Sequence, residues 1–537
     1  MGRKAAGGRL AFVVRSTARP DPGEWQEGAT HRPTPPARDP GLLHAPGPQQ
    51  GGPSFVRPLI VLILLSAAVR LVFAASLGLG VDESYMVAAG RVVSLGYFDH
   101  PPASWWLSSG AAQLFASEAP IAVRLPFIAL FALSSWLMAR LGAAIAGERA
   151  GFYAALSLNL SPVFSVTTGT WVLPDGPLVC ALLAAALCLV HALSHQNWRW
   201  WIGTGLCAGL ALFSKYSAVL TIFGAFVFML TNREHRTWLS RPQPYVAGIL
   251  ALLVFSPVVV WNAMHAWASF AFQGDRATGL RFHPLGPLVV LGGEALFVLP
   301  WIWAPMMAVF FAALRRGPGD WRSWLLACLA APPIVVFALV ALWSNQRVLF
   351  HWAAPGYLML FPLLGDAIAR RIGDAWVRRT IIATTLFLLA GIAFVCTQIR
   401  LDWLHPVIAA VARHDPDLEG FNWTSLRPEL AARGWLQSGT IVGVPNWRDA
   451  GKIGIALGRD VTVLCLSTDA RQFGFAQPLQ RFAGQDVLVL AVDHPDRAEQ
   501  TLSHKFAQLR VLGTVSIRHA RRDMAKVTVM RGTGLKT

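Results

Sequence analysis

Two adjacent carboxylates, Asp82 and Glu83, follow the first long apolar run of the chain. A carboxylate held beside a hydroxyl group can take its proton and act as a general base. Ionisable side chains at the edge of a membrane-embedded segment are costly, which makes them functional candidates. The solvated start of an ordinary loop is the alternative explanation for the pair. The next residues, 85–93, are compatible with an amphipathic helix, which we expect to lie in the membrane interface.

Two further acidic groups stand next to prolines. Asp99 and His100 lie in the sequence Gly-Tyr-Phe-Asp-His-Pro-Pro at residues 96–102, and Asp175 lies in the sequence Pro-Asp-Gly-Pro at 174–177. An Asp after a proline at the start of an apolar run is also a common helix cap. For Asp175, capping and a role that supports catalysis are therefore equally consistent with the sequence.

Isolated basic side chains lie within or beside other apolar runs. Lys215 has apolar helical residues on both sides, and Arg347 and His351 lie close together later in the chain. Arg matches a phosphate group as a two-pronged donor, and Lys matches it as a point charge. Snorkelling to lipid head groups is the alternative for each residue taken singly. Together with the carboxylates, these cations favour a site for an anionic ligand.

The elements that must position these residues are membrane helices. Of all residues, 54% are hydrophobic and only 14% are charged, whereas soluble proteins carry about 25% charged residues. Apolar runs long enough, or nearly long enough, to cross a bilayer predict about 11 spans. They are residues 58–77, 120–145, 150–168, 172–193, 200–213, 216–231, 243–262, 286–314, 323–343, 347–368 and 378–398. The two shortest runs leave this number uncertain by one or two.

The composition divides the chain into three parts. Residues 1–57 are rich in Gly, Pro and Arg and predict a disordered cytoplasmic tail without a secretory signal peptide. Residues 58–399 form the predicted transmembrane domain, with a long first outer loop at 78–119. Residues 400–537 contain short strand-like runs at 439–444, 461–466 and 486–492 and a helix-like stretch at 449–458. They predict a small soluble α/β domain.

Charge along the loops predicts the orientation. Arginines gather in alternate loops, at 140–149, 233–241, 315–322 and 370–379. Basic loops stay on the cytoplasmic side, so we expect the N-terminus inside and the C-terminal domain outside the cytoplasm. The candidate site residues then all fall on or next to the outer face. The net charge of +17 includes no block of consecutive basic residues, which argues against nucleic acid as a partner.

The order of these residues along the chain, and their predicted position on one side of the membrane, make the sequence resemble the GT-C superfamily of glycosyltransferases. The carboxylate pair, the turn at 96–102, the Pro-Asp-Gly-Pro segment and Lys215 are most similar to glycosyltransferase family 39. That family contains protein O-mannosyltransferases and lipid A aminoarabinose and galacturonic acid transferases. The resemblance covers roughly residues 55–400. It implies a polytopic α-helical protein of the bacterial cytoplasmic (inner) membrane, with a periplasmic C-terminal domain.

The resemblance also implies a reaction. A sugar moves from a polyprenyl-phosphate donor to an acceptor at the outer leaflet, with inversion at the anomeric carbon. Asp82 matches the family's base and Asp99 a second acidic position, and Glu83 completes the catalytic carboxylates. Lys215 and Arg347 match positions that hold the donor phosphate, and Asp175 and His351 join them in the predicted substrate site. His100 replaces a family Lys, which puts phosphate contact at that position in doubt.

The sequence leaves open whether a metal ion binds and which molecule accepts the sugar. No cofactor is required by the predicted chemistry, although Asp99 and His283 could bind a divalent cation, because some relatives place a metal-ligating His in that loop. The acceptor could be a cell-envelope lipid such as lipid A, a glycan or a protein, and membrane lipids surround the site. From another class, a secondary transporter is the main rival, but transporters place ionisable residues near the midplane and often show two related halves.

Overall fold

The computed structural model describes residues 54–537 apart from 280, 345–347, 405–415, 493–494 and 520–521. These residues belong to one unit of the chain. The predicted tail, 1–57, lies outside the described residues except for its last few positions. Arg347 also lies outside them.

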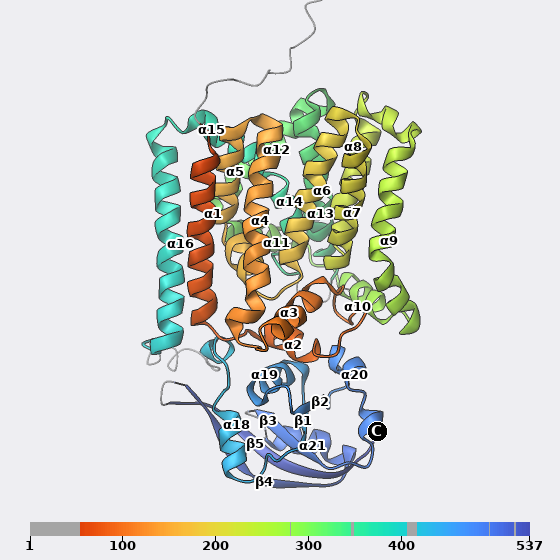
Figure 1. Cartoon of the computed structure of the whole chain (residues 1–537), viewed down its shortest axis with the longest axis vertical. Helices are drawn as coiled ribbons and strands as arrows, with labels where there is room; N and C mark the ends of the chain where they lie inside the picture. The colour runs from red at the N-terminus through yellow and green to blue at the C-terminus, as the bar shows by residue number, and fades with distance from the viewer. Residues whose placement is uncertain (1–53, 280, 345–347, 405–415, 493–494, 520–521) are drawn as a thin grey trace, which may run out of the picture. The chain divides into compact units, whose positions relative to one another are not determined.

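Long helices that run side by side make up most of the first two thirds of the chain (Figure 1). The helices and helical turns up to residue 264 are α1 (Val56–Ser76), α2 (Val81–Ala89), α3 (Ala103–Leu114), α4 (Pro120–Ala146), α5 (Glu148–Leu160), η1 (Val163–Thr168), α6 (Asp175–His195), α7 (Trp198–Ser214), α8 (Ala218–Thr231), η2 (His235–Ser240) and α9 (Pro242–Met264). Those that follow are α10 (Ala268–Ala277), α11 (Gly286–Val298), α12 (Pro300–Arg316), η3 (Gly317–Gly319), α13 (Trp321–Val340), α14 (Ala354–Leu358), α15 (Phe361–Arg371) and α16 (Ala375–Leu401).

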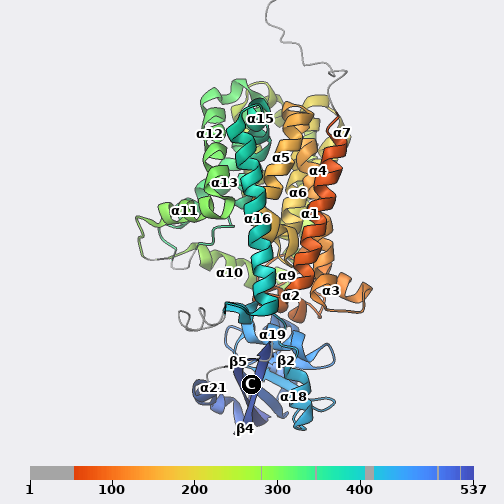
Figure 2. The same ribbon diagram turned by 90° about the vertical axis from the view of Figure 1, so that its left-hand side faces the viewer.

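Each predicted apolar run contains helix, but the predicted number of spans is not confirmed. Among the described residues, 6 helices are long and apolar enough to cross a membrane, or up to 7 if a bent pair counts as one span. That pair is α11 and α12, which meet at an angle of 114°, and Figure 2 shows α11 leaving the direction of the long helices. The run 286–314 was predicted as one span. The break lies at Leu299, whose φ is 83°, and Pro300 is the first residue of α12, a position that a proline tolerates well.

The helix α2, in the loop predicted as the first outer loop, is buried by other parts of the chain, and its position in the membrane interface stays a prediction. Its residues from Glu83 to Ala89 are buried. They pack against α19 (Trp447–Leu457) of the C-terminal domain. The approach is so close that a Cβ atom on Gly451 would lie 2.6 Å from the backbone nitrogen of Tyr85. Protein rather than lipid therefore covers the apolar face of α2.

The C-terminal domain is a five-stranded mixed sheet with helices. Its strands are β1 (Ile441–Val444), β2 (Thr462–Cys465), β3 (Val487–Val492), β4 (Phe506–His519) and β5 (Arg522–Leu535), and its other elements are η4 (Pro416–Glu419), α18 (Leu426–Ala432), α20 (Gln472–Ala476), η5 (Leu479–Phe482), α21 (Pro495–Leu502) and η6 (Ser503–Lys505). The strand order is β2-β1-β3-β5-β4. The first three strands, which are the predicted ones, pair in parallel. The long hairpin of β4 and β5 adds antiparallel strands that the sequence analysis did not predict.

Candidate functional site

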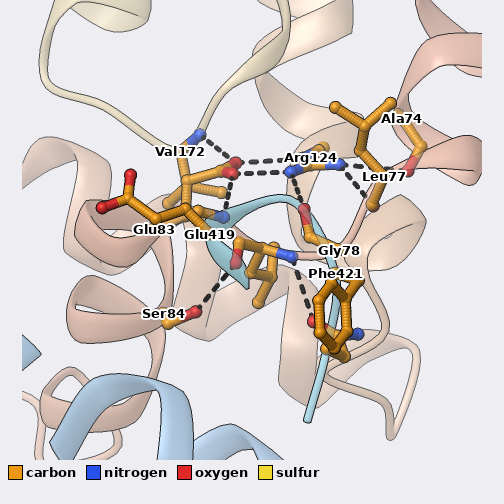
Figure 3. A network of polar contacts seen from close by, with 12 residues as sticks. Ala74, Leu77, Gly78, Glu83, Ser84, Arg124, Val172, Glu419 and Phe421 are labelled. Carbon is orange, nitrogen blue, oxygen red and sulfur yellow. Dashed lines mark hydrogen bonds and ion pairs between the residues drawn. The ribbon is translucent and has the colours of Figure 1, made fainter. Parts of the chain in front are cut away.

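Glu83 is the buried centre of a polar network at the start of α2 (Figure 3). Its carboxylate accepts hydrogen bonds from Arg124 Nε at 2.8 Å and Nη2 at 2.5 Å. It also accepts from the backbone N–H groups of Gly80 at 2.9 Å and Val172 at 3.0 Å. Burial disfavours the charged form, but Arg124 and the other donors outweigh it and hold the pKa of Glu83 below its ordinary value. Glu83 is thus ionised, and both of its oxygens are engaged.

Arg124, on α4, completes this network and is only 1% exposed. Its guanidinium also donates to the carbonyl oxygens of Ala74 at 3.1 Å, Leu77 at 3.0 Å and Gly78 at 2.6 Å, at the end of α1. These carbonyls have no partner within the helix itself. One ion pair therefore joins the end of α1, the start of α2, the helix α4 and the segment that precedes α6.

Asp82, the neighbouring residue, has the opposite environment. Its side chain is exposed, and within the described part of the chain no hydrogen bond or ion pair engages its carboxylate. Partial desolvation by the surrounding protein raises its pKa above the ordinary value, and the positive charges of Arg471 and Arg448 oppose that rise. A free carboxylate with a raised pKa can accept a proton from a bound hydroxyl group.

Asp99 is held by residues from three parts of the chain. Its side chain forms an ion pair with Arg471 of the C-terminal domain at 3.1 Å and accepts a hydrogen bond from the Tyr85 hydroxyl on α2. Its backbone oxygen accepts a hydrogen bond from the Gln273 side chain on α10. Burial raises the pKa of Asp99 to about 6, although Arg471 and Tyr85 oppose the shift.

Lys215 and Asp175 form a buried ion pair at the ends of α7 and α6. The Lys215 Nζ lies 2.9 Å and 3.0 Å from the two carboxylate oxygens of Asp175. The positive charge of Lys215 acts on both His100 and His351. Burial and this charge lower the pKa of His100 to about 3 and that of His351 to about 4, so both imidazoles are neutral at pH 7. The Nδ1 atom of His100 is buried and has no hydrogen-bond partner among the residues that the structure describes.

Arg276, on α10, interacts electrostatically both with the surroundings of Asp99 and with those of the Lys215–Asp175 pair. Its charge acts on Asp99 and on the imidazoles of His100 and His351, which lie near Lys215. The guanidinium lies 4.6 Å from the centre of the Trp352 ring, a cation–π contact. Desolvation lowers the pKa of Arg276, and the neighbouring charge of Arg471 adds to that effect. Arg276 therefore lies within electrostatic reach of the Asp82 and Asp99 carboxylates and of the two imidazoles near Lys215.

The predicted metal ligands do not assemble into a recognisable metal site. Asp99 is engaged by Arg471 and Tyr85, and His283 is exposed in the turn before α11. His283 lines a cavity of about 590 Å³ together with apolar residues of α11 and the segment 341–350. In the described residues, no group of three or more His, Cys, Asp or Glu side chains could hold a metal ion.

Several residues of this site were not predicted as members from the sequence. They are Tyr85, Arg124, Arg276, Arg471 and Gln472. One local signal was available for the Glu83 network, because a Glu at the third position of a helix often binds back to the N–H group before the first turn. No local signal marks Arg471 and Gln472. Arg471 contacts Asp99 and Gln472 contacts Phe98, each more than 370 residues earlier in the chain, and only the tertiary fold brings them together.

The sequence is similar to that of known sugar transferases. A family model described as dolichyl-phosphate-mannose-protein mannosyltransferase matches residues 99–261. The undecaprenyl phosphate-α-4-amino-4-deoxy-L-arabinose arabinosyl transferase 1 of Proteus mirabilis (strain HI4320) is 23% identical over 280 residues, which are 46% of this chain and 50% of that protein. The match thus spans half the length of this curated relative.

The fold is similar over nearly the whole chain to solved structures of ArnT from Cupriavidus metallidurans. The apo structure has a TM-score of 0.60 at 14% identity and covers 89% of this chain and 98% of ArnT. The structure bound to undecaprenyl phosphate has a TM-score of 0.59 at 15% identity and covers 88% and 98%. These comparisons confirm the resemblance seen in the sequence: the chain has an ArnT-like GT-C fold, and part of its sequence is similar to known sugar transferases.

Proposed function

We propose that this protein is an inverting glycosyltransferase that moves a sugar from a polyprenyl-phosphate donor to an acceptor at the outer face of the bacterial inner membrane. The proposal includes an inside position for the N-terminus and a periplasmic C-terminal domain. The structural similarity to an ArnT that binds undecaprenyl phosphate supports the class of donor. The acceptor that we favour is a cell-envelope lipid or glycan.

In the proposed reaction, Asp82 takes the proton of the acceptor hydroxyl group. The hydroxyl oxygen then forms a bond to the anomeric carbon as the bond from that carbon to the phosphate oxygen breaks. The polyprenyl phosphate leaves with the electron pair of the broken bond on its phosphate oxygen, so no general acid is required. Lys215 and Arg276 stabilise the developing negative charge, and the neutral imidazoles of His100 and His351 are placed to donate hydrogen bonds to it.

The observation that carries this proposal is the difference between the surroundings of Asp82 and of Lys215. Among the described residues the Asp82 carboxylate has no hydrogen-bond or ion-pair partner, and the charge of Arg276 interacts with Asp82 and with the imidazoles near Lys215. An inverting reaction needs a base on one face of the sugar and anion stabilisation on the other. The two halves of the site fit these demands.

The other predicted residues take more limited roles in this proposal. Glu83 positions α2, and hence Asp82, through its bonds to Arg124, and Asp175 holds Lys215 in place. Asp99 orients the turn that carries His100. Arg347 remains a predicted phosphate ligand. No step is assigned to a metal ion, because Asp99 and His283 lack further ligands among the described side chains.

The test is transfer of the sugar by purified protein in membranes, compared between Asp82→Asn and Glu148→Gln. Glu148 is an exposed carboxylate at the start of α5 and serves as the matched control. We expect Asp82→Asn to lower the turnover number by at least a hundredfold without changing the melting temperature, and Glu148→Gln to change neither. Full activity of Asp82→Asn would remove Asp82 from the mechanism.

A protein acceptor is the second candidate, because the family model that matches residues 99–261 is described as that of a protein mannosyltransferase. Mass spectrometry of envelope lipids, glycans and proteins from a deletion strain separates the two acceptors, since the sugar disappears from one class of molecule. Cysteine labelling tests the topology at the same time. Opposite labelling of positions 82 and 215 would contradict a single site and would favour a transporter.

A further inference from the structure

In addition to the packing of α19 on α2, two consecutive residues of the C-terminal domain, Arg471 and Gln472 at the start of α20, contact the loop at 78–119. The Arg471 Nη1 atom lies 3.1 Å from Asp99 Oδ1. The backbone N–H of Gln472 donates to the Tyr85 hydroxyl at 2.9 Å, and its side-chain oxygen accepts from the backbone N–H of Phe98 at 2.9 Å. Gln472 is only 2% exposed. These two residues thus contact both α2 and the turn at 96–102.

The Arg471 side chain is fixed from several sides. Its guanidinium lies 3.9 Å from the centre of the Trp447 ring on α19 and 5.5 Å from that of Phe272 on α10. Its Nε atom lies 3.7 Å from a carboxylate oxygen of Asp469. The backbone of Arg471 has a φ of 46°, in a region that favours glycine. Strained backbone of this kind is concentrated at functional sites, and here it carries a long charged side chain.

We propose that Arg471 and Gln472 form a clamp through which the C-terminal domain positions the catalytic loop, so that this domain is a functional part of the transferase site. The inference rests on the proposed function. Gln472 fixes the relative position of α2 and the turn at 96–102, because it bonds to Tyr85 on the first and Phe98 on the second. Arg471 fixes Asp99 and places a positive charge near Asp82.

The charge of Arg471 has a second consequence at Asp82. Arg471 and Arg448 lower the pKa of Asp82, and Glu419 and Glu83 raise it. The charge of Arg276 also interacts with Asp82. Removing the positive charge of Arg471 therefore raises the pKa of Asp82. A base must be ionised to accept a proton, so the acidic limb of the pH–rate profile should move to higher pH when Arg471 is neutralised.

The experiment measures transfer against pH in reconstituted full-length protein for Arg471→Gln, Arg471→Lys, Gln472→Ala and the control Arg481→Gln. Arg481 is an exposed Arg of the same domain, outside the clamp. For Arg471→Gln we expect the midpoint of the acidic limb to rise by about one pH unit, with about tenfold less activity on the acidic side. Arg471→Lys should keep the midpoint. Gln472→Ala should lower kcat without moving the midpoint, and Arg481→Gln should match the unchanged protein.

A second readout does not depend on transferase activity. A water-soluble carbodiimide with an amine labels protonated carboxyl groups, and mass spectrometry reports the labelled fraction of Asp82 at each pH. We expect the midpoint for Asp82 to rise in Arg471→Gln and to stay constant in Arg481→Gln. Equal midpoints in both variants, or kcat unchanged in Gln472→Ala, would overturn the clamp. Absence of transfer in the unchanged protein would instead contradict the proposed function, and the labelling midpoints would still test the clamp.

Discussion

Two buried ion pairs lie at the same end of the bundle and differ in how completely they are satisfied. The Glu83–Arg124 pair has four donors on one carboxylate, and the Arg124 guanidinium also binds three carbonyl groups. The Lys215–Asp175 pair has a neighbouring imidazole, His100, with a buried nitrogen that lacks a partner in the described part of the chain. A closed network of this kind stabilises the fold, whereas an incompletely satisfied one has bonding capacity left for a ligand.

The largest expected effect comes from breaking the Glu83–Arg124 pair. Glu83→Gln leaves the Arg124 guanidinium buried without its counter-ion, which costs about 3–5 kcal/mol of the free energy of unfolding. We expect a large drop in melting temperature and in the amount of folded protein in the membrane. If Glu83→Gln folded normally and lost only transfer activity, Glu83 would be a catalytic group and the contrast between the two pairs would fail.

A change in the Lys215–Asp175 pair should affect activity more than the fold. Lys215→Met removes the cation that faces the proposed phosphate, and we expect the turnover number to fall by about a hundredfold or more. This variant also leaves the Asp175 carboxylate buried and unpaired, so some stability is lost as well. The double variant Asp175→Asn/Lys215→Met should recover much of the melting temperature but none of the activity. Recovery of both would make this pair structural too.

The smallest effect concerns the titration of His100. Its pKa is lowered to about 3 in the folded protein, while an unfolded His titrates near 6.5. Between these values the unfolded state binds the extra proton, so His100 makes the protein less stable as the pH falls from about 6.5 toward 3. The variant His100→Asn should therefore lose less stability than the unchanged protein between pH 7 and pH 5 in thermal unfolding. Equal losses would mean that His100 is charged in the fold.

Much of the fold follows from patterns along the chain. The apolar runs predict the helices, and the short buried runs predict β1, β2 and β3, because these signals depend only on neighbouring residues. The strands β4 and β5 were missed because they mix exposed polar residues with buried ones, and no continuous apolar run marks them. The break at Leu299 was missed although Pro300 follows it, because the apolar run continues on both sides.

The candidate site was predicted in its residue types but not in its connections. Asp82 and Glu83 are adjacent in sequence, yet Asp82 has no partner among the described residues, whereas four donors bind the Glu83 carboxylate. Which of the two is buried depends on Arg124, 41 positions away from Glu83. The contribution of the C-terminal domain depends on contacts such as that between Arg471 and Asp99, which are 372 positions apart. Local sequence patterns contain no information about such distances.

The end of α1 has a consequence for how the protein is made. Its last carbonyl groups are bound by Arg124, and the next one, on Leu79, is bound by Lys452 across 373 positions of sequence. Domains form as the chain emerges from the ribosome, but Leu79 cannot reach its partner until most of the polypeptide has been made and the last helix has crossed the membrane. The apolar face of α2 therefore stays uncovered until α19 has been synthesised. A nascent chain that stops before residue 452 would leave that face exposed. We expect quality-control proteases to recognise such an unfinished molecule by this exposed apolar surface.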